Sequence, residues 1–144
     1  MRVAIPKEFL NEEMEKFLQW SEYRKVSEDG EKAVFEGVFS LEIDFGAFGF
    51  PRGKRREFYD RLEVVGGRKA LTPNGVSVTA RRNKAVLLRL SKEEHELLKQ
   101  YAGERGIAIS DAARAEITRA LLNWIKRKRL GKDAGKDAED SLYG

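Results

Sequence analysis

Residues 85–128 decide the fold expected for the C-terminal part of this chain; they read AVLLRLSKEEHELLKQYAGERGIAISDAARAEITRALLNWIKRK. Its opening, residues 85–91, is mostly apolar and has the length of a short strand. Ser91 stands three residues before Glu94, which is the spacing of a capping box. This pattern predicts that a helix follows the strand directly, over residues 92–105.

A second helix is predicted after a short connector. Gly106 stands where glycine commonly ends a helix, and Ser110 is a strong N-cap residue for the next one. The second helix should run to about Lys128. Its apolar stripe consists of Ala113, Ile117, Ala120, Leu121, Trp124 and Ile125.

A strand followed by two capped helices resembles the ribbon-helix-helix family of DNA-binding proteins. The resemblance covers about residues 85–128, less than a third of the chain. It is carried by VLLRLS at 86–91, by the turn GIAIS at 106–110 and by DAARAEITRALLNWI at 111–125. Two capped helices joined by a short turn also occur in ordinary helical hairpins.

The resemblance implies a homodimer in which two copies of the strand pair antiparallel and enter the major groove, which is wide enough for such a ribbon. Size supports dimerisation independently, because a strand and two short helices bury too little apolar surface alone. Since side chains alternate along a strand, one set should face the helices, namely Val86, Leu88 and Leu90. The opposite set should face DNA, namely Ala85, Leu87 and Arg89.

Base reading by this strand would depend on few side chains. Arg89 suits a bidentate contact to guanine, and Leu87 suits contact with a thymine methyl group. The family usually presents several polar side chains at the outward positions, whereas this chain presents Arg89 alone. The sequence therefore supports contact with DNA more firmly than sequence-specific readout.

Phosphate contacts are expected at two places. Arg81, Arg82 and Lys84 precede the strand and suit phosphates or a minor groove, or else they form a basic loop between two strands. By resemblance, the first backbone N–H groups of the second helix would hold a phosphate, at Ser110, Asp111 and Ala112. The Asp111 carboxylate would repel that phosphate while suiting the helix dipole, so a purely structural helix start stays open as the alternative.

Charge is distributed unevenly along the chain. Residues 1–80 hold 13 Lys and Arg against 14 Asp and Glu, residues 81–130 hold 13 against 6, and residues 131–144 hold 2 against 4. A strongly basic segment beside near-neutral ones is expected where a protein meets a polyanion. The alternative is the charged surface of a thermophile protein, since 36% of residues are charged and there is no Cys.

Composition also disfavours catalysis and cofactors. With no Cys and one His, disulfide scaffolds, thiolate zinc sites and multi-histidine metal sites are excluded. That histidine, His95, is expected on a helix surface. We expect no enzyme, no cofactor and no metal.

The N-terminal part of the chain, residues 1–80, is expected to be an accessory α+β domain of unknown role. Its predicted elements are a short strand at 2–5, a helix from Pro6 or Asn11 to Lys25, a long half-buried strand at 35–45, a loop at 46–54, a strand at 57–65, a hairpin turn at Gly66–Gly67 into 68–71, a turn at 72–75 and a strand at 76–80. The aromatic residues at 45–59 are expected to be core, with base stacking as the alternative.

The expected fold class is thus α+β: an N-terminal helix on a small antiparallel sheet (1–80), a ribbon-helix-helix module (81–130) and a disordered polar tail (131–144). The expected function is that of a cytoplasmic homodimer that binds double-stranded DNA sequence-specifically, as a transcriptional regulator such as a repressor, with higher-order assembly on DNA left open. No membrane partner is expected. The alternatives are an antitoxin-like module whose protein partner occupies the N-terminal domain, or a non-specific architectural DNA-binding protein.

Overall fold

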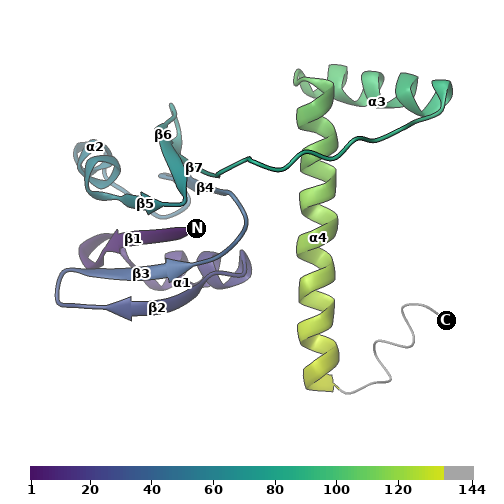
Figure 1. Ribbon diagram of the computed structural model, residues 1–144. Helices are drawn as coiled ribbons and strands as arrows, with labels where there is room; N and C mark the ends of the chain where they lie inside the picture. The colour runs from purple at the N-terminus through teal and green to yellow at the C-terminus, as the bar shows by residue number, and fades with distance from the viewer. Residues whose placement is uncertain (135–144) are drawn as a thin grey trace. The chain divides into compact units, whose positions relative to one another are not determined.

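The structure is a computed structural model that describes residues 1–134. It divides into two compact units, Met1–Ala85 (unit 1) and the residues from Val86 onward (unit 2), coloured from purple to yellow in Figure 1. The described residues form four α-helices and two small antiparallel sheets, so the fold class is α+β. Residues 81–84, which the sequence assigned to the second module, belong to unit 1.

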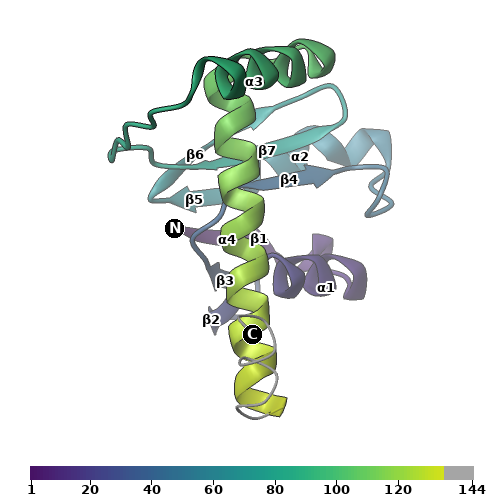
Figure 2. The ribbon, with the colours of Figure 1, turned by 90° about the vertical axis from the view of Figure 1, so that its right-hand side faces the viewer.

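Unit 1 contains both sheets (Figure 2). Sheet A has the order β2-β3-β1-β5, formed by Arg24–Glu28, Lys32–Glu36, Arg2–Pro6 and Glu63–Val65. Sheet B has the order β4-β7-β6, formed by Leu41–Asp44, Gly75–Ala80 and Gly67–Leu71. A 3₁₀ turn, Lys7–Phe9, and two helices complete the unit, namely α1 at Glu12–Trp20 and α2 at Arg52–Arg61.

A single hydrophobic core joins the two sheets. Val3 and Ile5 of β1 are fully buried, as are Val76 and Val78 of β7. The aromatic residues predicted as core lie within it: Phe45, Phe50 and Phe58 are buried and pack ring against ring, with the centroids of Phe50 and Phe58 4.7 Å apart. Base stacking by these three rings is therefore excluded by their burial.

The predicted first helix is too long. Asn11 caps α1, since its side chain accepts a hydrogen bond from the Met14 N–H at 2.8 Å. The helix ends at Trp20, and the backbone turns through Glu22, whose φ is 63°. The residues that follow pair with β3 as an edge strand, so Arg24 and Lys25 belong to a sheet.

The predicted long strand at 35–45 is two strands in different sheets. β3 ends at Glu36 and β4 begins at Leu41. Gly37 marks the break because a Cβ there would lie 2.6 Å from the ring of Tyr23, so only glycine fits at this close approach. Both strands still send alternate residues into one core, which is why the period of two runs through the break.

The predicted strand at 57–65 is wrong over most of its length. Residues 52–61 form α2, and only Glu63–Val65 is a strand. Ion pairs one helical turn apart support the helix, Arg56 with Asp60 at 3.1 Å and Arg61 with Glu57 at 3.2 Å. The predicted hairpin at Gly66–Gly67 is also wrong, because β5 pairs with β1 whereas β6 pairs with β7.

Unit 2 contains two helices, α3 at Lys92–Arg105 and α4 at Ile109–Ala134. The predicted capping box is present: the Ser91 hydroxyl accepts from the Glu94 N–H at 3.1 Å, and the Glu94 carboxylate accepts from the Ser91 N–H at 2.9 Å. Gly106 ends α3 with a left-handed φ of 65°.

Three predictions for unit 2 need correction. Residues 85–91 pair with no strand among residues 1–134 and run as an extended segment (Figure 1). Helix α4 begins one residue before Ser110, so Ser110 is not its N-cap. Helix α4 also continues to Ala134, past the predicted start of the tail at 131, and the rest of that tail lies outside the described residues.

Candidate nucleic-acid interface

The basic side chains predicted to contact DNA lie just before the extended segment and within it. Arg81, Arg82, Lys84 and Arg89 are all exposed. Within residues 1–134 none of these four side chains forms an ion pair or a hydrogen bond, although the Arg81 backbone N–H donates to the Gly66 carbonyl at 3.2 Å. Their charges are therefore available to an external anion.

The same segment exposes its aliphatic side chains on both faces. The exposed fractions are 82% for Val86, 80% for Leu87, 52% for Leu88 and 43% for Leu90. Ala85 is exposed as well. A run of aliphatic residues with neither face covered is unusual in a folded monomer, because each such side chain gains about 1.5–3 kcal/mol on burial.

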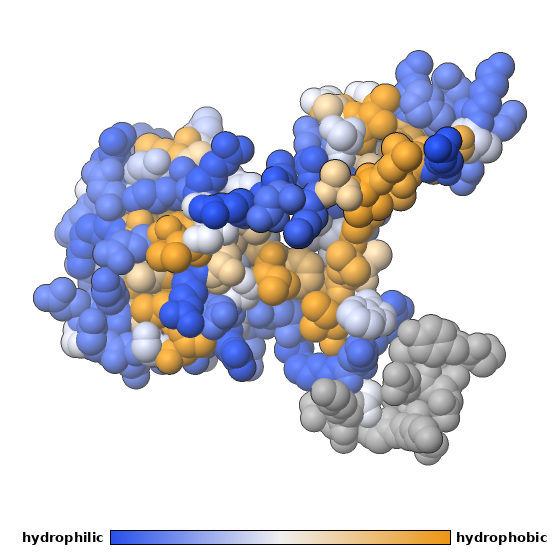
Figure 3. All heavy atoms as spheres, viewed as in Figure 1, coloured by the Kyte–Doolittle hydropathy of each residue, from blue (hydrophilic) through white to orange (hydrophobic). Residues whose placement is uncertain are grey.

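Unit 2 has almost no core of its own. Among its described residues only Ala102 of α3 and Ala112 of α4 are buried, and they lie in the two helices that pack on each other. The Tyr101 hydroxyl donates to Glu116 across the same pair of helices, and this bond raises the pKa of Tyr101. Larger apolar side chains stay exposed, namely Leu97 on α3 and Ile117, Leu121, Trp124 and Leu130 on α4. Figure 3 shows apolar surface along this part of the chain.

The predicted phosphate anchor at the start of α4 is smaller than expected. The Ala112 N–H already donates to the Ala108 carbonyl at 3.0 Å, and Ala112 is fully buried, so this residue cannot serve a phosphate. Ser110 and Asp111 remain exposed in the first turn. The Asp111 carboxylate accepts from Arg114 at 2.6 Å, which offsets part of its negative charge.

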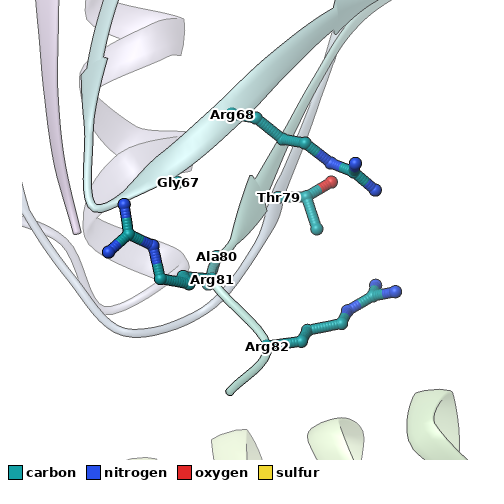
Figure 4. Close-up of a pocket in the computed structure, with 6 residues that line it drawn as sticks. All are labelled: Gly67, Arg68, Thr79, Ala80, Arg81 and Arg82. Carbon is teal, nitrogen blue, oxygen red and sulfur yellow. The ribbon is translucent and has the colours of Figure 1, made fainter.

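Arg81 and Arg82 lie beside an arginine that the sequence analysis did not select. A pocket of about 400 Å³ is lined by Gly67, Arg68, Thr79, Ala80, Arg81 and Arg82 (Figure 4). Arg68 stands opposite Thr79 in the β6–β7 ladder. The turn at Thr72–Gly75 was the signal that could have found it, since pairing the strands outward from that turn brings residue 68 to residue 79.

No group of three or more His, Cys, Asp or Glu in residues 1–134 is placed to hold a metal ion. His95 is exposed on α3. None of the described helices combines the length and the apolar character that crossing a bilayer would require.

Comparison of the chain with protein-family models, with curated proteins and with solved structures found no match.

Proposed function

We propose that the protein is a homodimer that binds double-stranded DNA and acts as a transcriptional regulator. In the dimer, residues 85–90 of two copies pair antiparallel, and the resulting ribbon enters the major groove. The observation that carries this proposal is the exposed segment of aliphatic residues at 85–90, which pairs with no strand among residues 1–134 and precedes two helices in which Ala102 and Ala112 are the buried residues of the described part.

A second copy of the chain would supply the two things that unit 2 lacks in the described residues, a partner for its extended segment and a hydrophobic core. An antiparallel pair of identical strands is self-complementary about a two-fold axis, so one segment supplies the backbone donors and acceptors that the other lacks. The inward residues Val86, Leu88 and Leu90 would then lie against α3 and α4 of both copies. The exposed face of α4, including Leu121 and Trp124, supplies further apolar surface for the same interface.

Charge favours DNA over a neutral partner for the surface that the ribbon creates. Residues 81–130 carry 13 Lys and Arg against 6 Asp and Glu. In the proposed register Leu87 and Arg89 point outward, where an arginine can read guanine and an aliphatic side chain can touch a thymine methyl group. Dimerisation doubles the positive charge facing one duplex, which favours association with a polyanion.

The test is a titration of labelled duplexes by fluorescence anisotropy at 50 and 200 mM salt. One duplex comes from upstream of the protein's own gene, and the other has an unrelated sequence. If each dimer neutralises about six to ten phosphates, affinity should fall by roughly 10³ to 10⁵ between the two salt concentrations. Tight binding to the first duplex alone is the result expected for a regulator.

Two other results would change the assignment. Equal, steeply salt-dependent binding to both duplexes would identify an architectural protein that grips the DNA backbone without reading bases. Absence of binding to either duplex would contradict the proposal. The second candidate function, dimerisation around a protein partner as in an antitoxin, would then be favoured by the same exposed apolar surface.

A further inference from the structure

The outer face of the β6–β7 hairpin in unit 1 concentrates positive charge. Alternation along β6 turns Lys69 toward the unit's interior, where its ammonium group donates to the carbonyls of Tyr59 and Leu62. Arg68 therefore lies on the opposite face, across the ladder from Thr79. Arg81 and Arg82 follow directly after β7 ends at Ala80.

Figure 4 shows how the side chains lie. Arg68 and Arg82 extend toward the same side of the hairpin, with the Thr79 side chain between them, whereas Arg81 extends the other way. The hydrogen bond from the Arg81 N–H to Gly66 holds the end of β7 against the start of β6. Two guanidinium groups and a hydroxyl thus border one open pocket.

Carboxylates do not compensate this charge. Elsewhere in unit 1 basic side chains commonly pair, as Lys32 does with Glu63 at 3.1 Å. Glu42 of β4 pairs with Ser77, two residues before Thr79 on β7. Its carboxylate oxygens accept from the Ser77 hydroxyl at 2.6 and 2.8 Å. In the described part of the chain no acidic group lies within ion-pair distance of Arg68 or Arg82.

We propose that Arg68 and Arg82, with the Thr79 hydroxyl between them, bind a phosphate group. The planar guanidinium fork matches phosphate oxygens in a bidentate manner, and a hydroxyl supplies a further donor. Arg81 is not included in this phosphate site, because its side chain extends away from the side chains of Arg68 and Arg82.

In the DNA complex the bound group is a phosphate of the duplex backbone, and this assignment of the source rests on the proposed function. Only two residues separate Arg82 from Ala85, where the ribbon strand begins, so their Cα atoms are at most about 11 Å apart. A phosphate flanking the groove that holds the ribbon is therefore within reach of Arg82. Unit 1 thereby gains a role, that of gripping the backbone beside the bases that unit 2 contacts.

The test uses the full-length ¹⁵N-labelled protein and follows its backbone amide signals by NMR during two titrations, one with inorganic phosphate and one with a DNA duplex. Duplex affinity is measured in parallel against salt for wild type and for Arg68→Ala/Arg82→Ala. The matched control is Arg24→Ala/Arg52→Ala, which removes two exposed arginines of unit 1 that also lack an ion pair in residues 1–134. Amide signals far from the pocket verify that each variant is folded.

If the phosphate site exists, both titrations should shift the backbone amide signals of Arg68, Thr79 and Arg82. The slope of log affinity against log salt should become less steep by about 2 in the pocket variant, because each of the two copies loses one phosphate contact. The slope should stay unchanged in the control variant. Shifts with inorganic phosphate but not with duplex would keep the phosphate site and identify a free phosphate compound as its ligand. Unmoved pocket amides in both titrations would overturn the site, and if the duplex still bound, the DNA-binding function would survive without it.

Discussion

In the proposed DNA complex, Arg89 is the residue on which sequence readout would depend. It is the polar member of the outward set formed with Ala85 and Leu87, and its side chain is exposed without a partner in the described chain. A single bidentate contact between arginine and guanine is worth about 1–3 kcal/mol of discrimination. Direct contacts to bases should therefore discriminate only weakly between DNA sequences. DNA shape and contacts to the DNA backbone would supply the remaining preference.

Replacing Arg89 by Ala should weaken binding to the preferred duplex by about 1–3 kcal/mol and leave binding to random DNA nearly unchanged. Anisotropy titrations of both duplexes at one salt concentration measure the difference. Lys99→Ala is the matched control, since Lys99 lies on α3 and pairs with Glu96 at 3.8 Å. An equal loss on both duplexes would show that Arg89 contacts phosphate and does not read a base.

Tyr23 makes the stability of unit 1 sensitive to alkaline pH. Burial raises its pKa from about 10 to about 12, and its hydroxyl donates to the Phe39 carbonyl. A group whose pKa is raised by folding contributes stability that is complete below its unfolded pKa and is lost as pH rises through its folded pKa. The free energy of unfolding should therefore fall between about pH 10 and pH 12. Urea unfolding of wild type and Tyr23→Phe measures this, and an equally steep fall in both would contradict it.

The candidate site was only partly predictable from residue types. Arg81, Arg82 and Lys84 stand out because they are adjacent in the sequence, and the structure leaves all three exposed. Arg68 has one basic neighbour in the sequence, Lys69, and looks like an ordinary surface position of a strand. Its importance appears only when the ladder register sets it beside Thr79 and Arg82, and a single sequence contains that information only through the turn between the strands.

At the scale of elements, α3 is defined by its cap. Ser91 and Glu94 satisfy each other's backbone N–H groups, and this pattern was readable in the sequence because it is local. The start of α4 was misread because Ser110 has the residue type of a cap, whereas the helix begins at Ile109 and Ala112 bonds to Ala108. Residue type alone did not locate the first turn.

The two serines provide a direct comparison. Ser91→Ala should lower the free energy of unfolding by about 1 kcal/mol, the usual cost of deleting an N-cap side chain. Ser110→Ala should change it by less than about 0.5 kcal/mol, as surface substitutions commonly do. Urea unfolding followed by helical circular dichroism measures both. A larger effect at Ser110 than at Ser91 would show that α4 is capped by Ser110 after all.

Other elements failed in the sequence analysis because their partners are distant. Residues 52–61 form a helix through paired charges and a single buried ring, Phe58, so they lack a strong apolar stripe of period 3.6. The alternation at 35–45 is real but spans two sheets, and the break at Gly37 is set by Tyr23 across the fold. Local patterns can predict α3, whereas these elements are decided by tertiary contacts.

At the scale of the whole molecule, the two units differ in how complete they are. Unit 1 closes a hydrophobic core around both of its sheets, whereas unit 2 leaves the aliphatic residues at 86–90 and the apolar face of α4 exposed. The short strand predicted at 85–91 is absent from the single chain, and pairing with a second copy would create it. Dimerisation would thus supply the strand partner, the hydrophobic core and the proposed DNA-facing surface together.

Disulfide cross-linking tests this event most directly, because the chain contains no Cys and a single introduced thiol has only its own copy as a partner. The outward set Ala85, Leu87 and Arg89 is centred on position 87, so antiparallel pairing about that residue sets the two copies of position 87 opposite each other at the two-fold axis. The two copies of position 85 then lie roughly 14 Å apart along the strands, well beyond the Cα separation of about 7 Å that a disulfide allows. Leu87→Cys should therefore give a covalent dimer on mild oxidation, and Ala85→Cys should not. Failure of Leu87→Cys to cross-link, or equal yields from the two variants, would contradict the proposed ribbon.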